Sequence, residues 1–219
     1  MTKLAIFDCD GTLVDSQANI CMAMEHAFEE AGLTPPMRHE TRRVVGLSLV
    51  ESMRMLLPEA ADDLHHDLAD KYRAAFWALR SNGLVDEPLY DGMAALLSSL
   101  DESGWMLGVA TGKSDRGLTR CLDHHALRSL FVTLQTADRH PSKPHPSMVY
   151  QALAEARADA ANAVVIGDTV YDIHMGRAAG TRTVGVNWGY HSVDDLREAG
   201  ADYIAESMDE LKVYLENFA

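Results

Sequence analysis

Cysteine, basic residues and long apolar runs are all scarce in this sequence of 219 residues. Three scattered cysteines cannot form a disulfide framework, so we expect a reducing compartment, the cytoplasm. With 19 Lys and Arg against 33 Asp and Glu, the net charge is −14, which argues against nucleic acid or an anionic membrane as partner. No window approaches the ~20 apolar residues of a membrane span. The first apolar run, residues 4–7, is too short for a signal peptide.

The sequence does contain several short apolar runs, each ending at a small or acidic residue. Such runs are typical of strands that are buried on both faces of a parallel sheet. They cover residues 4–7, 106–110, 163–166 and 184–186. Segments of helical period lie between them, over residues 91–102, 114–125, 146–156 and 170–179. This alternation predicts an α/β fold with a doubly wound, Rossmann-like parallel sheet.

Residues 16–86 break the alternation. Apolar residues recur there at helical spacing in three stretches, beginning near Ile20, Val50 and Leu64, which predicts amphipathic helices with no strand between them. Ser16 is expected to cap the first helix and Gly32 to end it. We therefore expect a core domain formed by residues 1–15 and 87–219, with a helical cap domain inserted over residues 16–86.

Ligands of open α/β sheets bind outside the carboxyl ends of the strands, so the residues that close each strand are the candidates for chemistry. Asp8 and Asp10 follow the first run and, two apart in extended chain, share one face. A simple turn is the alternative. Two like charges there are costly unless a cation or a proton offsets them. One carboxylate can act as a nucleophile while the other does acid–base work.

Two further strand ends carry polar groups. Asp168 closes another buried run and Asp172 lies one helical turn beyond it; helix capping by Asp168 explains only the first of the two. Lys143 precedes a helix and is a plausible counter-charge among four carboxylates, although a lone lysine is ordinarily a surface charge. Thr111 and Gly112 open a helix after a strand and suit a phosphate, or merely cap that helix.

Two other catalytic motifs are excluded because each lacks a required residue at the necessary spacing. A nucleotide-binding P-loop ending at Lys113 needs a glycine where Leu107 stands. A cysteine phosphatase built on Cys9 needs an arginine where Asp15 stands. We interpret Cys9 as a small buried residue.

These segments resemble the four motifs of the haloacid dehalogenase superfamily, in the family's order and from end to end of the chain. The matching segments are Asp8-x-Asp10-Gly11-Thr12-Leu13-x-Asp15-Ser16, Thr111, Lys143 and Gly167-Asp168-Thr169-x-x-Asp172. The helical insert resembles the family's C1 cap. Residues 45–48 and 143–146 look most like the phosphoglycolate phosphatase group.

The resemblance implies a hydrolase that forms an aspartyl phosphate on Asp8, while Asp10 protonates the leaving alcohol and then deprotonates water. It implies that Thr111, Gly112 and Lys143 hold the phosphoryl group. Mg²⁺ would be bound by Asp8, the backbone carbonyl of Asp10, and Asp168, with Asp172 orienting Lys143 or a metal-bound water. Charge supports the metal: four carboxylates against one lysine leave about −3, and a phosphate monoester adds nearly −2 more.

The expected substrate is a small phosphorylated metabolite, with phosphoglycolate favoured by the resemblance, and the protein is expected to be a monomer or homodimer. In the cap, Gly46 permits close backbone approach, and Arg42 or Arg43 is a candidate partner for a substrate carboxylate; solvated surface is the ordinary interpretation of such arginines.

Three other functions are weighed. A dehalogenase lacks the second acid, which is present here as Asp10. A phosphotransferase of the β-phosphoglucomutase type shares the core motifs and the cap and is the runner-up. A phosphoacceptor signalling module needs neither an insert of this size nor a general acid.

Overall fold

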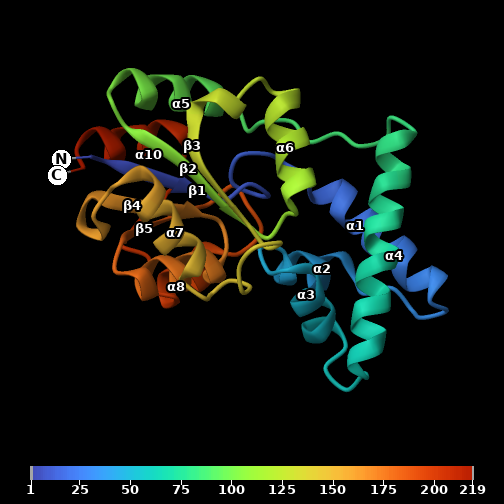
Figure 1. The fold of residues 1–219 in the computed structure, drawn as a ribbon. Helices are drawn as coiled ribbons and strands as arrows, with labels where there is room; N and C mark the ends of the chain where they lie inside the picture. Colours follow the sequence, from blue (N-terminus) through green and yellow to red (C-terminus); the bar gives the residue numbers. More distant parts are fainter. Residues whose placement is uncertain (1, 219) are drawn as a thin grey trace.

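The computed structural model of the chain describes residues 2–218, so residues 1 and 219, at the outer ends of the expected core domain, lie outside it. A six-stranded parallel sheet in the order β3-β2-β1-β4-β5-β6 lies at its centre (Figure 1). The chain builds outward from β1 to β3 and then in the other direction from β4 to β6, which confirms the doubly wound α/β fold. The strands are β1 (Leu4–Phe7), β2 (Met106–Thr111), β3 (Phe131–Thr136), β4 (Ala163–Gly167), β5 (Arg182–Val186) and β6 (Tyr203–Ala205).

Alternate residues of β1 face two separate apolar cores. Ala5 and Phe7 belong to a core completed by α5, α6 and α10, whereas Leu4 and Ile6 belong to a second core beneath α7 and α8. Because both faces of β1 are covered, all four of its side chains are fully buried and the strand has a continuous apolar sequence. These helices are α5 (Met93–Glu102), α6 (Asp115–His124), α7 (Ser147–Ala156), α8 (Val170–Ala179) and α10 (Met208–Glu216), and α9 (Val193–Glu198) packs beside β5.

The sequence pattern misses β3 and β6. β3 contains Thr133 and Gln135, which are buried but polar, so it does not form an apolar run. Both side chains donate hydrogen bonds to Glu155 Oε2 on α7, at 2.6 and 2.8 Å, which satisfies them inside the protein. β6 has only three residues at the sheet edge.

Five helices lie between β1 and β2; we call the first four the cap, and the remainder of the molecule the core. The cap lies beyond the carboxyl ends of the strands, at the right of Figure 1. It has a small apolar cluster of its own, formed by Met24, Phe28, Met53, Leu68 and Ala69. The sequence pattern predicts three of these helices and misses α2, whose sequence, RHETRRV, is mostly polar. The cap helices are α1 (Gln17–Glu30), α2 (Arg38–Val44), α3 (Leu49–Leu56) and α4 (Asp62–Ser81).

The two connections between core and cap run side by side. The amide of Asp15 donates to Pro88 O at 2.8 Å, and the amide of Tyr90 donates to Leu13 O at 3.1 Å. The cap is therefore attached through a pair of hydrogen-bonded segments, while its division from the core after residue 15 and before residue 87 stays a prediction. Across residues 2–218, no helix combines the length and apolar character that a membrane crossing needs.

Candidate active site

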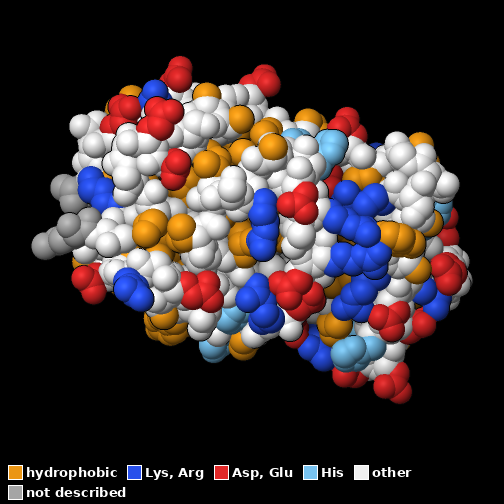
Figure 2. Space-filling view, turned by 45° about the horizontal axis from the view of Figure 1, so that its top comes forward, with side chains coloured by type: hydrophobic (Ala, Val, Ile, Leu, Met, Phe, Trp, Pro, Cys, Tyr) orange, Lys and Arg blue, Asp and Glu red, His pale blue; other side chains and the backbone are white. Residues whose placement is uncertain are grey.

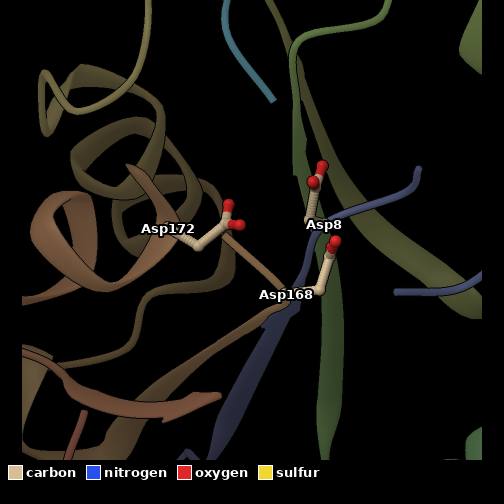
Figure 3. Close-up of side chains that lie close together, drawn as sticks. All are labelled: Asp8, Asp168 and Asp172. Carbon is tan, nitrogen blue, oxygen red and sulfur yellow. The ribbon is translucent and has the colours of Figure 1, made fainter. Parts of the chain in front are cut away.

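Three buried aspartates meet where β1 and β4 end. Asp8 follows β1, Asp168 follows β4, and Asp172 lies in the first turn of α8; one carboxylate oxygen of each lies within 4.8 Å of the others (Figure 3). β1 and β4 are neighbours in the sheet, with Phe7 opposite Ile166, which brings the first two together. Neighbouring strands thus assemble residues that lie far apart in the chain.

Lys143 supplies the positive charge in this cluster. Its Nζ lies 2.9 Å from Asp8 Oδ1 and 2.6 Å from Asp172 Oδ1, and none of its side chain is exposed. Burial lowers the pKa of Lys143, but the charges of Asp172 and Asp8 outweigh it and hold the pKa above its ordinary value. The lysine is therefore an ammonium ion shared between two carboxylates.

The cluster carries more negative charge than Lys143 offsets. Burial raises the pKa of Asp8 to about 7, with Asp172 and Asp10 adding to the effect. Burial and the charges of Asp8 and Asp172 also raise the pKa of Asp168 well above its ordinary value. Asp8 Oδ2 is buried with no hydrogen-bond partner in the described part of the chain. An unpartnered oxygen among buried carboxylates fits a hard cation such as Mg²⁺.

Asp168 is held by contacts that the motif does not reveal. Thr12 Oγ1 donates to its Oδ1 at 2.7 Å, and the amide of Tyr190 donates to its Oδ2 at 2.9 Å. Gly11 and Gly189 enclose the same carboxylate so closely that a Cβ on either would lie 2.2 or 2.1 Å from an Asp168 atom. Asp168 does not cap the helix, which was the alternative to a functional role: Thr169 occupies the N-cap position of α8, and its amide and hydroxyl donate to Asp172 Oδ2.

The side chain of Asp10 contacts a second set of charged residues, outside the carboxylate cluster of Asp8, Asp168 and Asp172. Its Oδ1 accepts hydrogen bonds from Ser16 Oγ and from Lys113 Nζ, the latter at 2.6 Å. Lys113 also contacts Glu87 at 2.8 Å, and Glu87 in turn pairs with Arg80 at the end of α4. Ser16 stands at the N-cap position of α1, as expected, but its side chain makes no cap hydrogen bond and donates to Asp10 instead.

Sequence reasoning missed this chain of charges from Asp10 to the cap. Lys113 lies inside the Thr-Gly-Lys segment and was a visible candidate, whereas Glu87, only 6% exposed in the connection after α4, gave no signal. Its position between Lys113 and Arg80 depends on how the cap packs against the core.

Thr111 and Gly112 lie at the end of β2, where the loop between α2 and α3 packs against the core. Gly112 has no room for a side chain, because a Cβ would lie 2.4 Å from Leu47 O and 2.8 Å from Gly46 O. Gly46 itself has a φ of +97°, in the left-handed region that glycine favours. The structure thus brings Gly46 against Gly112.

A cleft of about 440 Å³ separates the cap from the core. Asp8, Asp10, Thr111, Gly112 and Gly46 line it, while Lys143, Asp168 and Asp172 are buried behind these residues. Arg42 and Arg43 are not among its lining residues. Their helix contacts the core through the backbone instead, since Arg43 O accepts a hydrogen bond from Tyr171 at 3.0 Å.

The sequence and the fold of this chain are similar to those of known proteins. The family described as "Haloacid dehalogenase-like hydrolase" matches residues 5–186. A protein named "Probable phosphatase IndB" from Dickeya dadantii is 33% identical over 216 residues, covering 96% of this chain and 92% of that protein. One named "Tyrosine-protein kinase PtkA" from Mycobacterium tuberculosis is 31% identical over 214 residues, covering 96% and 71%. The crystal structure of a predicted phosphatase from Clostridium acetobutylicum is 28% identical, with a TM-score of 0.87 and 99% of each chain covered.

Proposed function

Because the chain belongs to the haloacid dehalogenase-like hydrolase family and is a phosphatase of that family, we propose that it hydrolyses a small phosphate monoester through an aspartyl phosphate on Asp8. The observation that carries this proposal is the state of Asp8. It lines the cleft, contacts Lys143 at 2.9 Å, and keeps one oxygen free of any partner within residues 2–218.

In the first step, an oxygen of Asp8 attacks phosphorus and the bond from phosphorus to the leaving oxygen breaks. Asp10 gives its proton to that oxygen, which departs as an alcohol. In the second step, water attacks phosphorus, Asp10 takes up the water's proton, and the bond to Asp8 breaks to release inorganic phosphate. One group serves both steps because the acid of the first is the base of the second.

The contacts of Asp10 support this role. Ser16 and Lys113 both donate to Oδ1, so the carboxyl group has a fixed orientation at the wall of the cleft. Lys143 and Thr111 would hold phosphoryl oxygens, with the backbone amide of Gly112 beside them. Asp172 keeps Lys143 in place through its contact at 2.6 Å.

The carboxylate cluster fits a divalent cation. Asp8, Asp168 and the backbone carbonyl of Asp10 would bind Mg²⁺, and Asp172 would orient Lys143 or a water molecule beside the metal. When bound, Mg²⁺ would neutralise the charge that gathers where a dianionic phosphate meets these carboxylates.

The decisive experiment is to trap the covalent intermediate. Protein mixed with substrate and Mg²⁺ is quenched in acid and digested, and the mass of the peptide containing Asp8 is measured by mass spectrometry. We expect a phosphoryl adduct on that peptide which hydroxylamine removes. Full phosphate release with no adduct at the shortest quench times, or an adduct on another residue, would contradict the proposal.

Phosphoglycolate is the substrate that the motif resemblance favours, and a screen of phosphorylated metabolites ranked by kcat/KM tests it. The same screen separates a phosphatase from a phosphotransferase of the β-phosphoglucomutase type, because a transferase returns the phosphoryl group to a sugar while releasing little inorganic phosphate.

A further inference from the structure

The wall of the cleft carries an accumulation of positive charge, and apart from Lys113, which contacts Asp10, the proposed reaction at Asp8 does not use it. Five of the chain's 19 Lys and Arg line the cleft, although the molecule as a whole carries a net charge of −14. Figure 2 shows Lys and Arg side chains gathered right of centre, where the core meets the cap. The five residues are Arg73, Arg80, Lys113, Arg116 and Arg120.

Three of these side chains have carboxylate partners. Arg73 pairs with Asp70 on its own helix at 2.6 Å, and Arg80 and Lys113 both pair with Glu87. Arg116 and Arg120, on the core helix α6, take part in none of the ion pairs formed within residues 2–218. Two guanidinium groups are therefore available to an anion.

Trp77 of the cap holds these two arginines in place. The guanidinium carbon of Arg116 lies 4.0 Å from the centre of the indole ring, and that of Arg120 lies 4.4 Å from it. Such contacts are favourable for a cation over an aromatic ring. Trp77 is 45% exposed, so it holds the arginines at the open side of the cleft and does not draw them into a core.

The two arginines repel each other in this arrangement. Desolvation, followed by the charges of Arg116 and Arg80, lowers the pKa of Arg120 from its ordinary value. Like charges held together without a counter-ion cost free energy, and an oxyanion placed between them would recover it. Asp138 is the one acidic residue that lines the cleft besides Asp8 and Asp10, and its Oδ2 already accepts from the amide of Asp115.

The size of the cleft agrees with a second subsite. At about 440 Å³ it lies within the range of pockets that hold drug-sized ligands, roughly 300–1,000 Å³, and a two-carbon monoester would leave much of it empty. Arg116 and Arg120 lie in the first and second turns of α6, beyond Thr111 and Gly112, so the subsite lies to one side of the reacting phosphoryl group.

We propose that Arg116 and Arg120, positioned by Trp77, form a subsite for a second oxyanion on the leaving group, so that the substrate is a phosphate monoester whose alcohol carries a phosphate or carboxylate several bonds from the scissile oxygen. This inference rests on the proposed phosphatase function and adds the class of leaving group.

The test uses alkyl monophosphates whose far end carries a hydroxyl, a carboxylate or a phosphate group. The three probes are compared at equal chain length, and the comparison is repeated for chains of two to six carbons. The measured quantity is the ratio of kcat/KM for an anionic probe to that for the hydroxyl probe. We expect wild-type protein to favour an anionic probe, and Arg116→Ala and Arg120→Gln each to reduce the ratio by about tenfold to 100-fold, the range for a charged hydrogen bond. The probe that gains most identifies the second group as phosphate or carboxylate.

Arg197→Ala is the matched control, because Arg197 is an exposed arginine on α9 that pairs with Asp194 and lies outside the cleft; its ratio should equal that of wild type. If Arg116→Ala lowers kcat equally on all three probes, the arginines only fasten the cap to α6, and the subsite is refuted. An unchanged ratio in both variants also refutes it, while phosphate release that depends on Asp8 would leave the proposed function intact. Absence of release from every probe and from the metabolite screen would refute the proposed function itself.

Discussion

At the scale of single residues, the site is governed by three buried carboxylates, two of which share one ammonium ion. Lys143 contacts Asp8 and Asp172, whereas Asp168 depends on Thr12 and a backbone amide. Burying charges in this way is costly unless each is paired. The arrangement therefore indicates a site that binds a further positive charge together with the reacting group.

Asp8→Asn should abolish turnover while the protein stays folded. An amide cannot attack phosphorus usefully, and removing a nucleophile commonly lowers kcat by about 10³-fold or more. The measurement is kcat with the best substrate from the screen, accompanied by the melting temperature as the control for folding. A variant that keeps a tenth of wild-type kcat would show that Asp8 is not the nucleophile.

Asp10→Asn should discriminate between leaving groups. An alkoxide needs a proton as it departs, so hydrolysis of an alkyl phosphate should fall by about 10²–10⁴-fold. Nitrophenolate needs little protonation, so hydrolysis of nitrophenyl phosphate should fall less. Both substrates are compared by kcat/KM in wild type and variant, and equal losses would argue against acid catalysis by Asp10.

At the scale of secondary-structure elements, the critical contact is between the end of β2 and the loop that joins α2 to α3. Gly112 and Gly46 meet there with no space for a Cβ on Gly112. How closely these elements approach decides how well the cap covers a substrate and excludes water.

Gly112→Ala should weaken catalysis by displacing the cap. The new Cβ would stand 2.4 Å from Leu47 O, and because that neighbour is backbone, the loop must move. Misplacement by about 1 Å can cost about 10²-fold in rate, so we expect a loss in kcat/KM of that order.

Gly117→Ala, further along α6, is the matched control for Gly112→Ala. The three atoms nearest its Cβ would belong to the side chains of Ser114 and Lys113, at 3.2 Å or more, so activity should stay near that of wild type. Comparable kcat/KM in the two variants would mean that the contact between Gly112 and the cap loop does not matter for catalysis.

At the scale of the whole molecule, an acidic protein concentrates positive charge along one cleft and negative charge behind it. A net charge of −14 repels anions at long range, so an anionic substrate depends on the local field of the cleft and on a cation in the carboxylate cluster. Binding of that cation should change how the free energy of unfolding depends on pH.

Metal-free protein should lose stability as pH rises. The pKa of Asp8 is raised to about 7 from an ordinary 3.8, so between these values the folded state holds a proton that the unfolded state has lost. The free energy of unfolding therefore falls as pH rises from about 4 to 7, by up to about 1.4 kcal/mol per unit. The raised pKa of Asp168 acts in the same direction.

Mg²⁺ should offset this loss, because it takes the place of the proton. We expect Mg²⁺ to raise the melting temperature more at pH 8 than at pH 5, measured against EDTA by calorimetry. Asp168→Ala should abolish most of that rise, and Mg²⁺ should fail to restore activity to this variant. An equal effect of Mg²⁺ at both pH values, or none, would contradict the metal assignment.

The amino-acid pattern alone was enough to predict the α/β fold, the helical insert and the positions of the strand-end aspartates. These features are local: a strand buried on both faces must be continuously apolar, and a polar residue that closes it must lie at the edge of the sheet. Asp8 and Asp168 could therefore be placed at the same edge of the sheet from their runs alone, whereas the adjacency of β1 and β4 comes from the structure. β3 could not be recognised, because Glu155 satisfies its buried Thr133 and Gln135 from another element.

Which charges meet across the boundary between core and cap depends on how these two parts of the molecule pack together. Glu87 lies between Lys113 and Arg80, and Trp77 lies against Arg116 and Arg120, through contacts that depend on how α4 packs against α6. The sequence offered Arg42 or Arg43 as candidates for contacting a substrate carboxylate, yet neither lines the cleft. Helical periodicity shows which face of a helix is apolar, but the partner of a charged side chain depends on the angle at which two helices pack.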